Sequence, residues 1–126
     1  MPEPHISKIG QISLNAHDLD RAVAFYRDTL GLSLLFQAPP KMAFFDCGGV
    51  RLMVGTPEDP EFDHPSSILY YKVDDIHAAH AALKERGAEF RTEPHLVAKM
   101  PDHELWMAFL KDTEGNTLAL MSEVRG

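Results

Sequence analysis

Hydrophobic and polar residues alternate near the start of the chain, which is the pattern of a strand with one buried face. Ile12 and Leu14 fall on one face of this strand, which is predicted at residues 9–16. The opposite, polar face carries Gln11, Ser13 and Asn15. After this strand the apolar residues recur at helical spacing. Asp18 and Gly31 are placed to cap the start and the end of the helix. The chain is therefore predicted to begin with a strand followed by a helix.

Three more strands are predicted after this helix, so the first unit has the order βαβββ. They cover residues 33–37, 42–47 and 50–55. A second unit of the same order follows, with a strand at 67–73, a helix capped by Asp74 or Asp75 and ended by Gly87, and strands near 88–91, 105–110 and 116–121. Residues 92–102 contain Pro94 and Pro101 and are expected to be irregular.

The two units also match in sequence, because residues 11–22 align with residues 68–79 without a gap. Asp18 then aligns with Asp75. The acidic, proline-rich stretch 56–65 has no periodicity and is predicted to be the linker between the copies. We therefore predict a single α+β domain of two βαβββ modules, which cover residues 8–55 and 66–122.

Composition and charge restrict the classes of function. With 126 residues, of which 44% are apolar, the chain can form the core of one domain without metals or disulfides. The formal charge of −7 argues against a nucleic-acid partner, which requires clustered Lys and Arg. No apolar run approaches the roughly 20 residues that cross a bilayer, no signal sequence is visible, and Cys47 is the only cysteine. We therefore expect a cytoplasmic protein without a membrane partner.

Four segments of the chain resemble the motifs of a known superfamily. They are Ile12 to Leu19, the stretch from Ala24 to Leu32 that contains Phe25-Tyr26 and Leu30-Gly31, the turn Val73-Asp74-Asp75-Ile76, and the turn Asp112-Thr113-Glu114-Gly115-Asn116. Together they are similar to the vicinal oxygen chelate superfamily of glyoxalase I, bleomycin-resistance proteins and extradiol dioxygenases. The resemblance implies a cupped, partly open mixed sheet barrel with helices outside, a small-molecule ligand inside the cup, and a homodimer.

Relatives that use a metal hold it with four strand residues that face the cup. The resemblance places these positions at Gln11, Met53, Ile68 and Ala119. Glyoxalases use glutamine at the first position, but methionine, isoleucine and alanine are not useful ligands for a hard or borderline divalent ion. We therefore expect neither a cofactor nor a metal centre of the usual type, and we keep a divalent metal at an atypical site as the alternative.

The residues that share a face with Gln11 are the candidate ligand-binding residues, by period-two geometry along each strand. The predicted set is Gln11, Ser13, Asn15, Arg51, Met53, Tyr70 and Lys72, with Trp106 and Phe109 as apolar walls. Burying so many polar groups without partners costs about 1–3 kcal/mol per group, so a wet or liganded cavity is favoured. Arg51 and Lys72 either hold an anionic or carbonyl-rich ligand or reach the rim and pair with acidic residues.

His95 and Glu104 are the candidate catalytic residues. Both belong to the stretch 93–106, near where relatives close over the ligand. An unperturbed imidazole titrates at about pH 6.5, so His95 can act as an acid or base near neutral pH. Gln11, His95 and Glu104 are also the candidate ligands of an atypical metal site.

Three functions stay open at this point. The first is a glyoxalase/bleomycin-resistance-like protein that binds a small organic molecule in a β-cup without the usual metal centre. The second is a lyase or isomerase of the glyoxalase type, which uses an atypical metal or metal-free acid–base chemistry. The third is a structural dimer module with a collapsed cup. The sequence does not distinguish a cup within one chain from a cup between two chains.

Overall fold

The first sheet contains four strands and follows the predicted βαβββ order. The structure is a computed structural model that describes residues 4–125. The elements are β1 (Gln11–Asn15), α1 (Leu19–Ala24), a π-helical stretch η1 (Phe25–Thr29), β2 (Ser33–Ala38), β3 (Met42–Cys47) and β4 (Val50–Gly55). The strand order is β1-β4-β3-β2, with β1 parallel to β4 and the other pairs antiparallel. The predicted bounds of β3 and β4 are confirmed.

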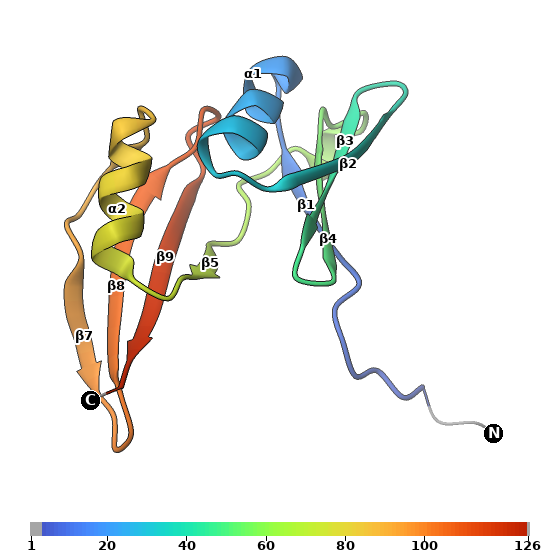
Figure 1. Ribbon diagram of the computed structural model, residues 1–126. Helices are drawn as coiled ribbons and strands as arrows, with labels where there is room; N and C mark the ends of the chain where they lie inside the picture. The colour runs from blue at the N-terminus through green and yellow to red at the C-terminus, as the bar shows by residue number, and fades with distance from the viewer. Residues whose placement is uncertain (1–3, 126) are drawn as a thin grey trace.

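The second sheet repeats this topology. A short helix, η2 (Pro60–Phe62), lies in the connecting segment, and β5 (Leu69–Lys72), α2 (Ile76–Glu85), β6 (Glu89–Phe90), β7 (His95–Lys99), β8 (Glu104–Lys111) and β9 (Thr117–Val124) follow. Its order is β5-β9-β8-β6, with β7 also paired to β8. The predicted α+β class is confirmed, and the two mixed sheets do not close into a barrel within residues 4–125 (Figure 1).

The expectation that residues 92–102 are irregular is wrong at one point, because β7 (His95–Lys99) lies inside this segment. Pro94 and Pro101 flank the strand, so neither removes a hydrogen bond from its interior. β7 is an edge strand that pairs only with β8, and the register shifts between Leu96 and Ala98. An edge strand with a bulge lacks the regular alternation by which strands are recognised.

Two aspartates start the helices as predicted. The Asp18 side chain accepts a hydrogen bond from the Arg21 amide, and the Asp75 side chain accepts one from the Ala78 amide. Gly31 follows the first helix with a φ of +81°, a backbone conformation that favours glycine. None of the helices within residues 4–125 is long and apolar enough to cross a membrane.

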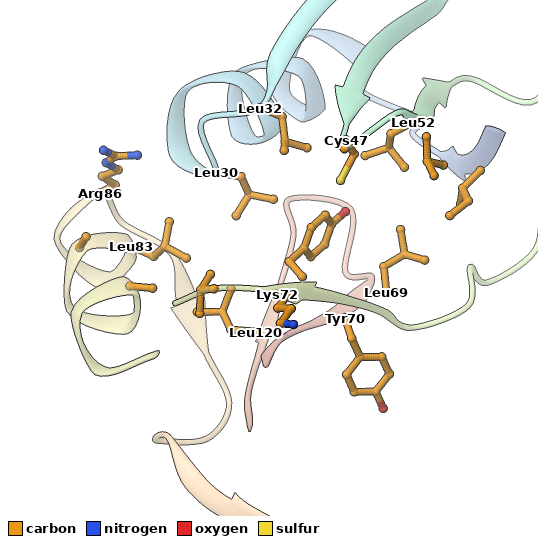
Figure 2. Close-up of a pocket in the computed structure, with 17 residues that line it drawn as sticks. Leu30, Leu32, Cys47, Leu52, Leu69, Tyr70, Lys72, Leu83, Arg86 and Leu120 are labelled. Atoms are coloured by element: carbon orange, nitrogen blue, oxygen red, sulfur yellow. The ribbon is translucent and has the colours of Figure 1, made fainter. Parts of the chain in front are cut away.

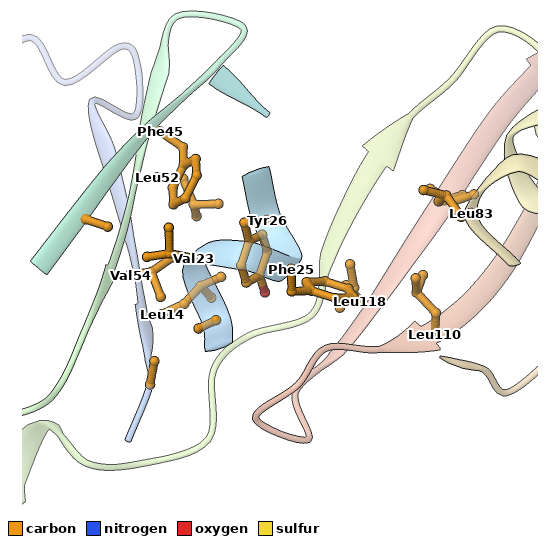
Figure 3. Close-up of a cluster of buried hydrophobic side chains, with 14 of the residues drawn as sticks. Leu14, Val23, Phe25, Tyr26, Phe45, Leu52, Val54, Leu83, Leu110 and Leu118 are labelled. Atoms are coloured by element: carbon orange, nitrogen blue, oxygen red, sulfur yellow. The ribbon is translucent and has the colours of Figure 1, made fainter. Parts of the chain in front are cut away.

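The core lies between the two sheets, on the side of each sheet that faces its helix. Leu14, Leu52 and Val54 come from the first sheet, and Leu118 and Leu120 from the second, and all five are buried. They belong to one cluster with residues of both helices, and Figure 3 shows Phe25 of η1 reaching toward Leu118. Because both helix-side faces point into this shared core, the opposite faces of the two sheets point outward. We call them the outer faces.

A buried hydrogen-bond centre at Asp112 joins the two modules. Its carboxylate accepts from the Tyr26 hydroxyl at 2.7 Å, from the amides of Glu114 and Asn116 at 2.8 Å each, and from Asn116 Nδ2 at 2.9 Å. Burial, together with the Asp112 carboxylate, raises the pKa of Tyr26, so its hydroxyl stays a donor. The turn 112–116 therefore fastens the second sheet to the helix of the first module.

Glu114 adds a second connection between the modules. Its two carboxylate oxygens accept hydrogen bonds from the backbone amides of His17 and Asp18, at 2.7 and 3.2 Å. These amides precede α1, where the helix dipole favours a negative charge. Together with the Tyr26–Asp112 bond, this contact fixes how the two outer faces are directed.

Candidate ligand-binding faces

The outer face of the first sheet brings together five of the predicted ligand-binding residues. In the parallel pairing of β1 with β4, Gln11 lies opposite Arg51 and Ser13 opposite Met53. Asn15 follows on the same face of β1, since side chains two residues apart share a face. The period-two argument therefore places these five side chains on one surface, as the sequence predicted.

Arg51 is held over an aromatic ring on this face. Its Nε donates a hydrogen bond of 2.9 Å to Gln11 Oε1, and its guanidinium carbon lies 5.4 Å from the centroid of the Phe44 ring. Phe44 in turn stacks on Phe36, with 4.6 Å between the ring centroids. We call these four side chains, Gln11, Arg51, Phe44 and Phe36, the arginine–aromatic platform. Phe36 was missed in the sequence because β2 lacks regular alternation, with a register shift between Leu34 and Phe36.

A hollow of about 720 Å³ adjoins the platform on the same face. Its floor contains Ser13, Asn15 and Met53, whereas Gln11 and Arg51 do not line it. Its wall is the linker, represented by Pro57, Glu58, Asp59, Phe62, His64 and Ser66. The volume falls in the range of about 300–1,000 Å³ that is typical of ligand pockets.

Asn15 holds the linker in place over this hollow. Its Nδ2 donates to the backbone oxygens of Phe62 and His64, the latter at 3.1 Å. The Thr56 hydroxyl donates to the Ala16 carbonyl at 2.7 Å and fixes the start of the same segment. The linker was not predicted to line a pocket, because this segment has no periodicity. Phe62, an aromatic residue within an acidic, proline-rich stretch, is the residue that could have indicated it.

The outer face of the second sheet carries four further predicted site residues, and three of them have ring side chains. The Tyr70 ring meets the Phe109 ring edge-on at 6.1 Å between centroids, and the His95 ring lies roughly parallel to Phe109 at 6.4 Å. Tyr70 and His95 are exposed. His95 Nδ1 lies 2.9 Å from the carbonyl oxygen of Glu93. These rings form a second aromatic surface, which the shared core separates from the arginine–aromatic platform of the same chain.

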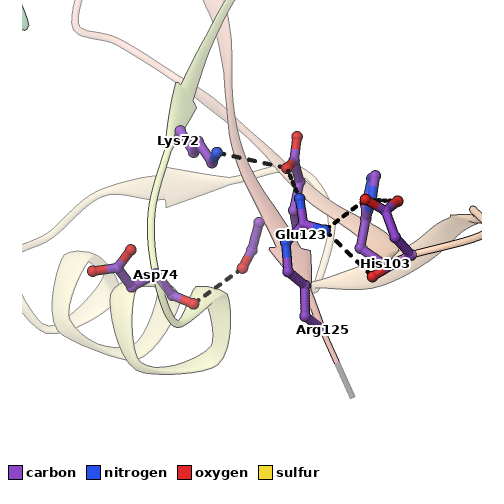
Figure 4. A network of polar contacts seen from close by, with 7 residues as sticks. Lys72, Asp74, His103, Glu123 and Arg125 are labelled. Carbon is purple, nitrogen blue, oxygen red and sulfur yellow. Dashed lines mark hydrogen bonds and ion pairs between the residues drawn. The ribbon is translucent and has the colours of Figure 1, made fainter.

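Lys72, also on this face, has a carboxylate partner. Its Nζ lies 3.6 Å from Glu123, and Glu123 is also 3.2 Å from Arg125 (Figure 4). Arg125 continues the network to Asp102 at 2.7 Å, and His103 lies 2.8 Å from the same carboxylate. Of the two roles considered for Lys72, pairing with an acidic residue is the one found in the isolated chain.

The Asp102 carboxylate gives a testable pH dependence. The hydrogen bond from Arg125, followed by that from His103, lowers the pKa of Asp102 to about 2 from its ordinary value of 3.8. Because the folded pKa is the lower one, these contacts stabilise the fold above pH 3.8, and this contribution is lost as the pH falls through about 2. We expect a carboxyl NMR titration to give a midpoint near 2 for Asp102, and Arg125→Gln to raise it. An unshifted midpoint in the wild-type protein would contradict the network.

Glu104 and Trp106 lie on the other side of the second sheet. Trp106 Nε1 donates to Glu104 Oε1 at 3.2 Å, and the Trp106 ring meets the His77 ring of α2 at 5.3 Å. β7 pairs His95 with Met107, and Met107 lies three positions after Glu104 along β8. An odd spacing puts Glu104 on the face opposite to His95. The structure therefore does not bring the two candidate catalytic residues together, nor Trp106 to Phe109.

The residues at the four metal positions do not fit a divalent cation. Only Gln11 offers an oxygen, and this oxygen already accepts a hydrogen bond from the Arg51 guanidinium, whose positive charge repels a cation. Met53 lies on β4, the partner strand of β1, and Ala119 lies on β9, the partner strand of β5. Ile68 precedes β5. Across residues 4–125, no three His, Cys, Asp or Glu side chains cluster in a way that could hold a metal ion. We derive no metal-dependent step for this chain.

Comparisons with known proteins agree with this architecture. Residues 8–120 match the model of the Glyoxalase/Bleomycin resistance protein/Dioxygenase superfamily. A glyoxylase-like domain-containing protein of Didymella fabae is 32% identical over 124 residues, which span 90% of this chain and 91% of that protein.

Solved structures show the same fold at lower sequence identity. TnmS3, an antibiotic binding protein from Streptomyces sp. CB03234, superimposes with a TM-score of 0.76 at 24% identity, over 96% of this chain and 99% of that chain. A lactoylglutathione lyase from Agrobacterium tumefaciens gives a TM-score of 0.74 at 22% identity, over 93% and 94%. The resemblance seen in the sequence motifs is confirmed, and the chain belongs to the glyoxalase/bleomycin resistance protein/dioxygenase superfamily.

Proposed function

We propose that this protein binds a small organic molecule that contains a planar aromatic ring and an anionic or carbonyl oxygen. The observation that supports this proposal is the arginine–aromatic platform, in which Arg51 lies over Phe44 beside the half-exposed ring of Phe36. A planar ring can stack on such a surface, and the guanidinium can donate to an oxygen at the ring's edge. The antibiotic binding protein TnmS3, which shares the fold, is consistent with a binding role.

The site is proposed to be completed by a second copy of the chain. Each chain presents half of a cup on each outer face, and the two halves point away from each other. Phe36 is 48% exposed on the first sheet, and Tyr70 is 45% exposed on the second. In a twofold homodimer, the platform of one chain faces Tyr70 and Phe109 of the partner, and two equivalent sites result.

The stretch 4–10 gives independent support for a homodimer. It extends from β1 away from both sheets (Figure 1), and Ile6 and Ile9 are 90% and 61% exposed. Exposed aliphatic side chains on an extended segment favour contact with another chain. The hydrogen bond from Arg51 to the Gln11 amide oxygen supports a form of binding that does not depend on a metal.

The platform predicts a measurable loss of affinity when its charge is removed. We expect Arg51→Met to weaken binding of naphthoate, a planar aromatic carboxylate, by about tenfold or more, because the charge-assisted hydrogen bond is lost. Isothermal titration calorimetry with naphthoate, and in parallel with bleomycin, measures the affinity.

Arg27→Met serves as the matched control, because Arg27 is exposed on η1 and pairs with Asp28. It should bind naphthoate as tightly as the wild-type protein does. The proposed function is contradicted if the Arg51 and Arg27 variants bind naphthoate with equal affinity. It is also contradicted if neither naphthoate nor bleomycin binds saturably to the wild-type protein.

A further inference from the structure

A second hollow, of about 600 Å³, lies between the two modules on the helix side of both sheets. Figure 2 shows Leu30, Leu32 and Cys47 of the first module on one side of it and Leu83 and Leu120 of the second module on the other. Ile12, Leu52 and Leu69 also line it. Tyr70 and Lys72 of the outer face also border this hollow, although Figure 2 shows the Tyr70 ring directed away from the aliphatic side chains. The aliphatic lining itself belongs to the helix-side faces of the strands, so the hollow differs from the site proposed above.

The lining is mostly aliphatic, and Tyr71 and Cys47 contribute neutral polar groups to it. The Tyr71 hydroxyl is buried and has no hydrogen-bond partner within the part of the chain that the structure describes. Burial raises the pKa of Tyr71 and also that of Cys47, so both groups stay protonated at neutral pH. A buried hydroxyl without a partner is unfavourable, and a ligand oxygen in the hollow would satisfy it.

Arg86 provides a cation at the margin of the hollow, beyond Leu83 (Figure 2). It is exposed, and its Nη1 donates to the Thr29 carbonyl at 3.2 Å, which orients the guanidinium. Among residues 4–125, no carboxylate lies within ion-pair distance of it, so its remaining donors are free to meet an anion. Lys72 is a second cation among the lining residues, but it already pairs with Glu123. An aliphatic hollow with an unpaired guanidinium at its edge has the polarity of an amphiphile.

We propose that this hollow binds an aliphatic carboxylate, with the hydrocarbon chain between the two modules and the carboxylate at Arg86. The aliphatic lining accepts the chain without discriminating its length closely, since burial of apolar surface is non-directional. Arg86 supplies the specificity for an anionic end over a neutral one, because a guanidinium pairs with a carboxylate through two parallel hydrogen bonds. Such a ligand contacts both modules and therefore stabilises their packing.

The test is calorimetric titration of the full-length protein with dodecanoate below its micelle concentration, and with dodecanol as the neutral analogue. The wild-type protein is expected to bind dodecanoate saturably. Arg86→Gln should weaken dodecanoate binding by about tenfold and leave dodecanol binding unchanged. The control is Lys84→Gln, which removes a positive charge from the last turn of α2, just before Arg86, at a residue that does not line the hollow. It should change the affinity for neither dodecanoate nor dodecanol.

A second variant tests the hollow itself without disturbing the core. Ala82 lines the hollow yet is exposed, so Ala82→Leu narrows it and should weaken both dodecanoate and dodecanol. The proposal is overturned if dodecanoate does not bind saturably, if the Arg86 and Lys84 variants behave alike, or if Ala82→Leu has no effect. Naphthoate is titrated into the same samples. Loss of dodecanoate binding alone then contradicts the hollow, whereas absence of naphthoate binding contradicts the proposed function.

Discussion

Asp112→Ala is expected to lower the free energy of unfolding by about 3–5 kcal/mol, because hydrogen bonds to a buried charged group contribute more than ordinary ones and several are lost together. The substitution leaves the Tyr26 hydroxyl, which is 1% exposed, without its partner inside the core. It also releases the amides of Glu114 and Asn116 that shape the turn. Urea unfolding followed by circular dichroism measures the change.

The matched comparison is Asp74→Ala, at an exposed aspartate outside this centre, which should stay within about 0.5 kcal/mol of the wild-type protein. Tyr26→Phe alone is expected to lose about 1–3 kcal/mol. In the Asp112→Ala background the same change should cost almost nothing, since the bond is already absent. If Asp112→Ala is as stable as Asp74→Ala, the connection between the modules has been assigned to the wrong residues.

Much of the fold could be predicted from local pattern. The helix starts at Asp18 and Asp75 and the bounds of β3 and β4 follow from capping chemistry and alternation, which act within a few residues. β7 could not be predicted, because it pairs on one side only and its register shifts after Leu96. The break from α1 into η1 at Phe25 was also invisible, since helical spacing of apolar residues does not distinguish an α-helix from a π-helical stretch.

The candidate site was predictable only where side chains alternate strictly between the two faces of a strand. This alternation on β1 and β4 predicts the face that carries Gln11 and Arg51. The pairing of Trp106 with Phe109 ignored the same rule, because an interval of three along a strand places two residues on opposite faces. Phe36 joins the platform through contact with Phe44 from a neighbouring strand, and the linker joins the hollow through Asn15. Both depend on tertiary contacts that one-dimensional periodicity does not contain.

The largest expected effect on function comes from substituting residues in either half of the proposed site, which two chains are proposed to share. In the proposed homodimer every site takes Arg51 from one chain and Tyr70 from the other, so Arg51→Met and Tyr70→Ala are each expected to damage both sites of their own homodimer. Both residues are exposed in the isolated chain, so neither substitution removes core packing. We expect each homodimer to bind naphthoate at least about tenfold more weakly than the wild-type protein. Sedimentation should give twice the chain mass of 14.1 kDa for all three proteins.

The mixed dimer of these two variants tests the shared site most directly. In such a dimer one site carries both substitutions and the other carries neither. Calorimetric titration of differently tagged, co-purified mixed dimers with naphthoate should therefore give one site of wild-type affinity per dimer, against two in the wild-type protein. A mixed dimer with no site of wild-type affinity, or a Tyr70→Ala homodimer that binds like the wild-type protein, would contradict a site built from two chains.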